Sequence, residues 1–210
     1  MARESIAVLV AHPDDETLWA GGTLLEQRAW RPFVVSACRA SDADRAPKFL
    51  AALAELGAEG EMADLDDGPE QAPLPDALVE QALLDALPKR QFDRILTHSP
   101  AGEYTRHRRH EEVGRAVLRL WLSERLRAPE LWLFAYDDGG RAYLPRAKPD
   151  ADIIRELSDE VWQHKRRLIC ERYGFGTDSW EARVTPRREA FHRIDSAQAA
   201  EAWLNRRSEP

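Results

Sequence analysis

The feature that most constrains the fold of this chain is a regular alternation of short apolar runs with longer helix-like stretches. Runs rich in β-branched or aromatic residues predict four strands, at Ile6–Val10, Phe33–Ala37, Arg94–Thr97 and Leu131–Tyr136. The helix-like stretches cover approximately residues 14–29, 45–57, 75–87 and 110–127. Strands that alternate with helices are typical of an α/β domain, so we expect a largely parallel central sheet.

The rest of the chain completes the same prediction. One longer helix is expected over residues 152–172, ended by Gly174 and Gly176, and its apolar stripe is Ile153, Leu157, Val161, Leu168 and Ile169. A closing strand is expected at Phe191–Ile194, and Ser196 is expected to cap a last helix. In the third helix the expected buried face is Leu78, Leu83, Leu84 and Leu87. The sequence contains no repeat or long linker, so residues 1–210 are predicted to form a single domain.

Composition excludes several classes of protein. The formal net charge of −7 argues against a general nucleic-acid binder, which is usually basic. Cys38 and Cys170 are too few for a disulfide framework and favour a reducing compartment. No signal peptide or membrane-spanning run is apparent, so a soluble cytoplasmic protein without a membrane partner is expected. The oligomeric state stays open, a homo-oligomer included.

Polar clusters follow the predicted strands. They are His12–Glu16, Arg39–Arg45, Asp66–Asp67, His98–His110 and Asp137–Asp138. Open α/β sheets bind ligands outside the carboxyl ends of their strands. The clusters are therefore expected to meet in one place.

The sequence Ala11-His-Pro-Asp-Asp-Glu16 carries the strongest chemical signal. Proline and acids at a helix start also suit simple capping and dipole roles, and Glu16 is assigned to that role. His12 and Asp15 lie three residues apart across a sharp turn, so both can face one cation. Asp14 lies between them and can face a water molecule at that cation. Zinc held by three protein ligands activates such a water, and a nearby carboxylate can take its proton.

A second histidine pair, His107 and His110, has the three-residue spacing that places both imidazoles on one side of a helical turn. This spacing favours one metal ligand and one neighbouring polar or acid group. Alone it is a weak signal, but together with His12 and Asp15 it predicts a metal site.

These residues give the chain a specific resemblance to the LmbE-like, or PIG-L, family of zinc-dependent N-deacetylases. The shared signature is A-H-P-D-D-E after the first strand and a later H-x-x-H. The resemblance implies a Rossmann-like three-layer sandwich that hydrolyses an N-acetyl group, commonly on a glucosamine-type sugar. It also implies that His12, Asp15 and His110 bind the metal and that Asp14 is the general base. His107 would stabilise the oxyanion or protonate the leaving amine.

Weaker matches to the family imply substrate contacts. Arg45 and Asp67 would contact sugar hydroxyls, and Tyr104 would polarise the substrate carbonyl. Each also has a plain interpretation, as an exposed helix arginine, a turn residue and a buried loop aromatic. The chain departs from the family at Arg108-Arg109, where many members have Pro-Asp. Two cations there would disfavour a protonated His107 and would suit an anionic group on the substrate.

Together with this resemblance, the metal-site residues predict a zinc-dependent N-deacetylase that acts on an N-acetylated small molecule, although two histidines and a carboxylate also suit Fe²⁺. An amidase that releases a larger acyl group is an alternative with the same ligands. A catalytically silent Rossmann-like binding protein is an alternative from another class. Its nucleotide-binding version is disfavoured because no G-x-G-x-x-G follows the first strand.

Overall fold

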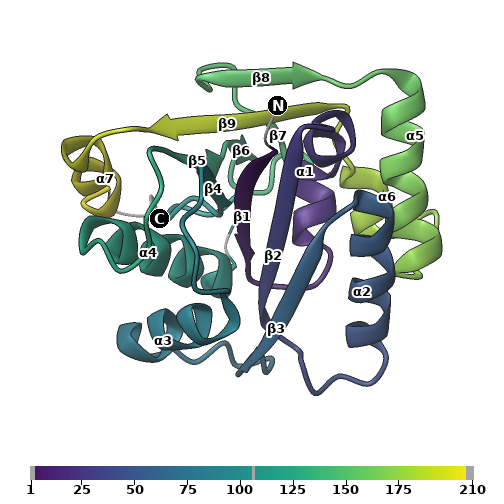
Figure 1. Cartoon of the computed structure of the whole chain (residues 1–210). Coiled ribbons are helices and arrows are strands. Elements are labelled where there is room, and N and C mark those ends of the chain that lie inside the picture. Colours follow the sequence, from purple (N-terminus) through teal and green to yellow (C-terminus); the bar gives the residue numbers. More distant parts are fainter. Residues whose placement is uncertain (1–2, 106, 207–210) are drawn as a thin grey trace.

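A seven-stranded sheet forms the middle layer of the molecule (Figure 1). The computed structural model describes residues 3–105 and 107–206. In these residues the strand order is β3-β2-β1-β4-β5-β9-β8. The parallel strands are β1 (Glu4–Val10), β2 (Trp30–Cys38), β3 (Glu59–Leu65), β4 (Arg94–Thr97) and β5 (Leu131–Phe134). Strand β9 (Arg188–Ile194) pairs antiparallel with β5, and β8 (Ile153–Glu156) pairs antiparallel with β9. The predicted α/β fold with a largely parallel sheet is confirmed.

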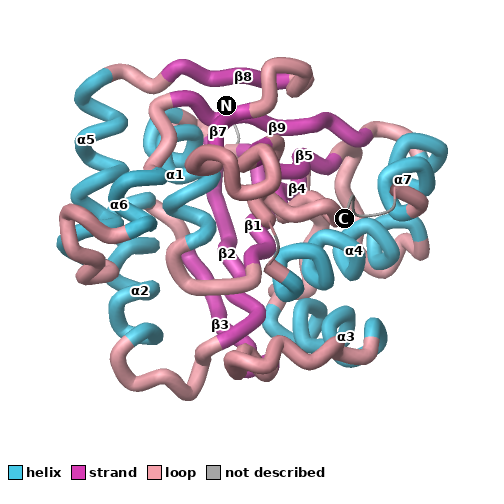
Figure 2. Tube along the Cα trace, turned by 180° about the vertical axis from the view of Figure 1, so that it is seen from behind, coloured by secondary structure: helices cyan, strands magenta, loops and turns pink. Residues whose placement is uncertain are grey.

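Helices cover both faces of the sheet (Figures 1 and 2). One face carries α1 (Asp15–Glu26), α2 (Arg45–Leu56), α5 (Asp159–Arg167), the π-helical turn η1 (Leu168–Arg172) and α6 (Trp180–Val184). The other face carries α3 (Asp76–Ala86), α4 (Arg108–Leu122) and α7 (Ala197–Leu204). Strand β1 serves both cores because successive side chains point to opposite faces. Ile6, Val8 and Val10 therefore enter one core, whereas Ala7 and Leu9, with Ala11 directly after the strand, enter the other.

Two local predictions need correction. The helix predicted over 152–172 begins only at Asp159, where the Ser158 hydroxyl accepts the Val161 N–H. The residues before it form β8, because pairing with β9 extends the sheet and overrides the local helical pattern. In α3 the buried face is displaced, since Val79 is buried whereas Leu78 is 48% exposed.

Some of the observed strands have no clear strand pattern in the sequence. Strand β3 precedes the polar pair Asp66–Asp67, but no residue range was predicted for it, and its sequence E-G-E-M-A-D-L is poor in β-branched residues. A small second sheet pairs β6 (Tyr136–Asp137) with β7 (Arg146–Ala147). Within residues 3–105 and 107–206, no helix combines the length and apolar character needed to cross a membrane.

Candidate metal centre and substrate pocket

The loop between β1 and α1 fixes the first two polar side chains of the site. The His12 backbone N–H donates to Asp15 Oδ2 at 2.8 Å, and the Asp15 N–H donates to the His12 carbonyl at 3.3 Å. Trp19 Nε1 donates to the other oxygen of Asp15, Oδ1, at 3.1 Å. The turn therefore closes on itself and holds the Asp15 carboxylate with Oδ2 toward the histidines.

His110, in the first turn of α4, is oriented by a buried carboxylate. Its Nδ1 lies 2.7 Å from Glu103 Oε2, and the same oxygen lies 3.0 Å from His98 Nδ1. The Ser99 N–H donates to Glu103 Oε1 at 3.0 Å. Burial alone would raise the pKa of Glu103, but the contacts with His98 and His110 lower it to about 2. The ionised Glu103 thus accepts a hydrogen bond from the Nδ1–H of His110, so the lone pair of His110 Nε2 stays free.

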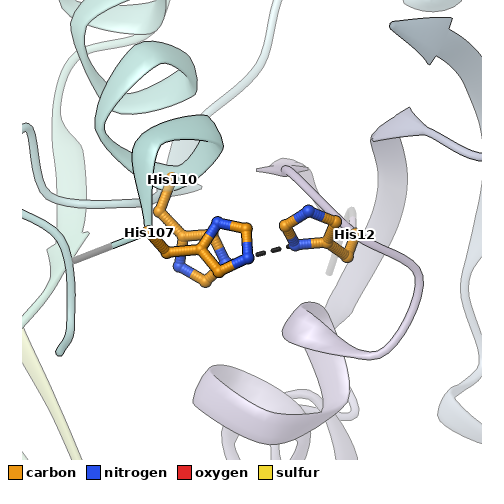
Figure 3. A group of neighbouring side chains, drawn as sticks. All are labelled: His12, His107 and His110. Atoms are coloured by element: carbon orange, nitrogen blue, oxygen red, sulfur yellow. Dashed lines mark hydrogen bonds between the residues drawn. The ribbon is translucent and has the colours of Figure 1, made fainter. Parts of the chain in front are cut away.

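His12, Asp15 and His110 direct three atoms at one point. His12 Nδ1 lies 3.1 Å from Asp15 Oδ2 and 3.2 Å from His110 Nε2, and the last two atoms are 3.4 Å apart. His12 Nε2 is bonded to Asp67 Oδ1 at 3.1 Å. Figure 3 shows the His12 ring facing His107 and His110.

These separations fit a tetrahedral metal ion. Zinc bound at about 2.0–2.1 Å places its ligand atoms about 3.3 Å from one another. The far atoms of both imidazoles are committed to carboxylates, so the three near atoms present lone pairs to one another and require a cation between them. Without a metal ion, a proton on His12 takes the place of the cation between these atoms. Burial lowers the pKa of His12, but hydrogen bonds and charges of Asp15 and Asp67 raise it to about 10.

Other groups that could hold a metal ion overlap this one. They are His12 with His107 and His110, Asp15 with His98 and His110, and His12 with Cys38 and Asp67. His98 is a poor ligand because its Nε2 accepts the Ala11 N–H at 3.0 Å while its Nδ1 bonds Glu103. His98 therefore supports the loop after β1.

His107 stands beside the three converging atoms with a free ring nitrogen. Its ring centroid lies 4.5 Å from that of His12 and 4.4 Å from that of His110. In the described part of the chain, its buried Nδ1 has no hydrogen-bond partner. Burial and the proximity of His110 and His12 lower the pKa of His107 to about 3. His107 is therefore neutral at physiological pH.

A cavity of about 190 Å³ opens beside these groups. All eight residues predicted for the site except His110 line it. Within the described ranges, no hydrogen bond engages the Asp14 carboxylate, and burial together with the Asp15 charge raises the pKa of Asp14. Arg45 lies over the Phe175 ring, 4.6 Å from its centroid, and Tyr104 contacts the Trp180 ring at a centroid distance of 4.9 Å.

Asp67 has a further role that its sequence context did not indicate. Its Oδ1 contacts His12 Nε2 and accepts from Gln71 Nε2 at 2.8 Å, and its Oδ2 accepts from Arg39 at 2.7 Å. The carboxylate therefore orients His12, and its predicted contact with a sugar hydroxyl stays a prediction.

The predicted anion-binding role of the two arginines is wrong for Arg109. Arg109 is fully buried and binds Glu112 at 2.5 Å, the Asp66 carbonyl at 2.5 Å and the Ala72 carbonyl at 2.9 Å. It ties the loop after β3 to α4 and does not reach the cavity. Arg108 is exposed and likewise does not line the cavity.

Several site residues were not assigned from the sequence. Glu103 lies in the polar loop before the second histidine pair, and its position seven residues ahead of His110 is a signal for a supporting carboxylate. Phe175, Trp180 and Glu181 come from a distant segment and carry no motif. Glu16 occupies the first turn of α1, as expected for a dipole role, but it is also fully buried and hydrogen-bonded.

Comparison with known proteins relates this geometry to a family. Residues 7–121 match the family model described as PIG-L, GlcNAc-PI de-N-acetylase. Uncharacterized protein L374 of Acanthamoeba polyphaga mimivirus is 22% identical over 182 residues, which cover 80% of this chain and 75% of that protein.

Solved structures share the fold at low identity. N,N'-diacetylchitobiose deacetylase from Pyrococcus horikoshii superposes with a TM-score of 0.66 at 15% identity, covering 91% of this chain and 84% of that one. The 4-carboxy-2-hydroxymuconate hydratase of Pseudomonas putida KT2440 gives 0.64 at 17% identity, covering 91% and 96%. The A40926 pseudoaglycone deacetylase gives 0.64 at 16%, covering 92% and 98%. The same fold thus occurs in deacetylases and in a hydratase, so the reaction must be argued from the site.

Proposed function

Because this chain belongs to the PIG-L family, we propose that it is a metal-dependent hydrolase of N-acetylated small molecules. The proposed substrate is an amino sugar of the N-acetylglucosamine type or a conjugate of one. The observation that carries the proposal is the convergence of His12 Nδ1, Asp15 Oδ2 and His110 Nε2, separated by 3.1, 3.2 and 3.4 Å. The cavity beside them contains the free carboxylate of Asp14.

His12, Asp15 and His110 are the proposed ligands of Zn²⁺, and the same donor set also suits Fe²⁺. When bound, the ion acts as a Lewis acid that polarises the acetyl carbonyl and lowers the pKa of water to about 7. Three protein ligands leave a position open for that chemistry. Asp67 and Glu103 hold the two imidazoles in the tautomers that metal binding needs.

Asp14 and His107 perform the proton and charge steps in this proposal. Asp14 removes a proton as water attacks the acetyl carbon, and a tetrahedral intermediate forms. The neutral His107 donates a hydrogen bond from its ring N–H to the developing oxyanion. Its low pKa disfavours the imidazolium form that would protonate the amine. Asp14 then passes its proton to the amine nitrogen as the C–N bond breaks. The products are acetate and a free amine.

We propose an acetyl group in preference to a larger acyl group, because the cavity is small. Its volume of about 190 Å³ is below the ~300–1,000 Å³ of typical ligand pockets. Arg45 and Tyr104 are the proposed substrate contacts, with Arg45 on the hydroxyls and Tyr104 near the carbonyl. We also propose a cytoplasmic location, because Cys38 and Cys170 are free thiols.

The test is acetate release from a panel of N-acetylated amino sugars by metal-stripped protein, with and without added zinc. Zinc-dependent release is expected, and Asp14→Asn should lower turnover about 10²–10⁴-fold without weakening zinc binding. Release of larger acyl groups alone would instead identify an amidase. Absence of zinc binding, or full turnover in the Asp14→Asn variant, would overturn the proposal.

A further inference from the structure

We propose that Tyr173 and Glu16 are positioning residues that hold the backbone of Asp14 and thereby aim its carboxylate into the cavity. The inference rests on the proposed function, in which Asp14 is the general base. It adds a link between that base and the segment that forms the aromatic wall of the cavity.

The link begins at Glu16, a buried carboxylate that does not line the cavity. Its Oε1 accepts hydrogen bonds from the Tyr173 hydroxyl at 2.6 Å and from Thr17 Oγ1 at 2.5 Å. Its Oε2 accepts the backbone N–H of Asp14 at 3.1 Å. Both oxygens are therefore engaged, one by the distant tyrosine and the other by the proposed base.

Asp14 needs such support because its backbone is strained. Its φ of 138° and ψ of −25° lie outside the regions that an L-residue with a side chain prefers. Conformations of this kind cost of order 1–3 kcal/mol and persist only where surrounding contacts hold them. Here the Asp14 N–H is held by Glu16, and its carbonyl accepts the Leu18 N–H at 2.8 Å. If the N–H were released, the peptide could relax and rotate the carboxylate away from the cavity.

Tyr173 couples this support to the pocket wall. It is 2% exposed and directly follows η1. The next residue, Gly174, has a φ of +80°, which turns the chain so that Phe175 reaches the cavity. Trp180 and Glu181, a few residues later, line the same cavity. The Tyr173 hydroxyl thus joins this segment, which lies beyond the residues 7–121 matched by the family model, to Asp14.

The experiment compares Tyr173→Phe with Tyr136→Phe in the zinc-loaded enzyme. The two substitutions remove one buried hydroxyl each, and both hydroxyls bond to α1, but the Tyr136 hydroxyl donates to the Trp19 carbonyl at 3.0 Å. Tyr173→Phe should lower kcat about tenfold with KM and zinc affinity unchanged, because displacement of a catalytic group slows the reaction. Tyr136→Phe should stay within about twofold of the wild type.

A second measurement does not depend on catalysis. The hydrogen exchange of the Asp14 amide, followed by NMR, should be faster in Tyr173→Phe and unchanged in Tyr136→Phe. If the wild type releases no acetate, the proposed function fails while this exchange still decides the hydrogen-bond link. Unchanged Asp14 exchange, an unchanged kcat in Tyr173→Phe, equal losses in both variants, or a parallel loss of zinc affinity would overturn the inference.

Discussion

Replacing Glu103 with glutamine should weaken the metal site without touching a proposed ligand. The Glu103 carboxylate accepts from His110, His98 and the Ser99 N–H, and a glutamine amide has one oxygen in place of two. Whichever way the amide turns, its NH₂ group faces at least one donor. Loss of a carboxylate behind a metal-binding histidine lowers metal affinity about 10–100-fold. An unsatisfied buried donor also lowers the free energy of unfolding by about 1–3 kcal/mol.

Two assays separate these effects. Zinc affinity is measured by competition with a chromophoric chelator, and stability is measured by thermal unfolding, where about 2–4 °C of Tm is expected per kcal/mol. Glu112→Gln is the matched control, because Glu112 is a buried acid on α4, the helix that carries His110. It binds Arg109 and the Leu74 N–H instead of a histidine. It should lower Tm and leave zinc affinity intact. Equal zinc affinity in Glu103→Gln and the wild type would refute the reasoning.

Three further outcomes are expected. Zinc affinity should rise about tenfold per pH unit toward pH 10, since His12 has a pKa of about 10 and must lose its proton to bind metal. Calorimetry in two buffers should detect the release of this proton on zinc binding. A zinc affinity that does not change with pH would contradict this prediction. Arg109→Met should lower the free energy of unfolding in urea by about 3–5 kcal/mol by leaving Glu112 unpaired, and a KM that rises only for anionic substrates would argue against a structural role. Gly114→Ala should lower the free energy of unfolding by about 1–3 kcal/mol, because the alanine Cβ would lie 2.6 Å from the His98 carbonyl oxygen. An unchanged Tm would show that the loop after β4 moves to accommodate the methyl group.

The sequence was most informative where one local pattern predicted both a strand and the position of the polar residues that follow it. The continuous apolar run Ile6–Val10 predicted a strand, and the polar residues after it had to emerge at the carboxyl end of the sheet. The structure buries this strand on both faces. The same argument placed His110 near His12, although 98 residues separate them. Proximity followed from topology, so no knowledge of side-chain contacts was needed.

The remainder depends on contacts between distant segments. The stretch 152–158 has a helical pattern, but its neighbour β9 makes it a strand. Asp67 looked like a turn residue, and only the folded chain places its carboxylate against His12. The Asp14 N–H likewise donates to Glu16, and Glu16 accepts a hydrogen bond from Tyr173, a residue on a different part of the chain. No periodicity in the sequence encodes such partners.

Two separate segments of the chain line the cavity, and this separation determines how the substrate selectivity can be changed. The residues proposed for chemistry fall between His12 and His110, whereas Phe175, Trp180 and Glu181 complete the lining from a later segment of the chain. Grafting a different segment 175–181 should therefore retarget the enzyme to another amide while its hydrolytic machinery is inherited intact. The graft should begin after Tyr173, because the Tyr173 hydroxyl donates to Glu16 in α1. A library randomised at the three wall positions, with Tyr173 fixed, would be a compact starting point for engineering new deacylases.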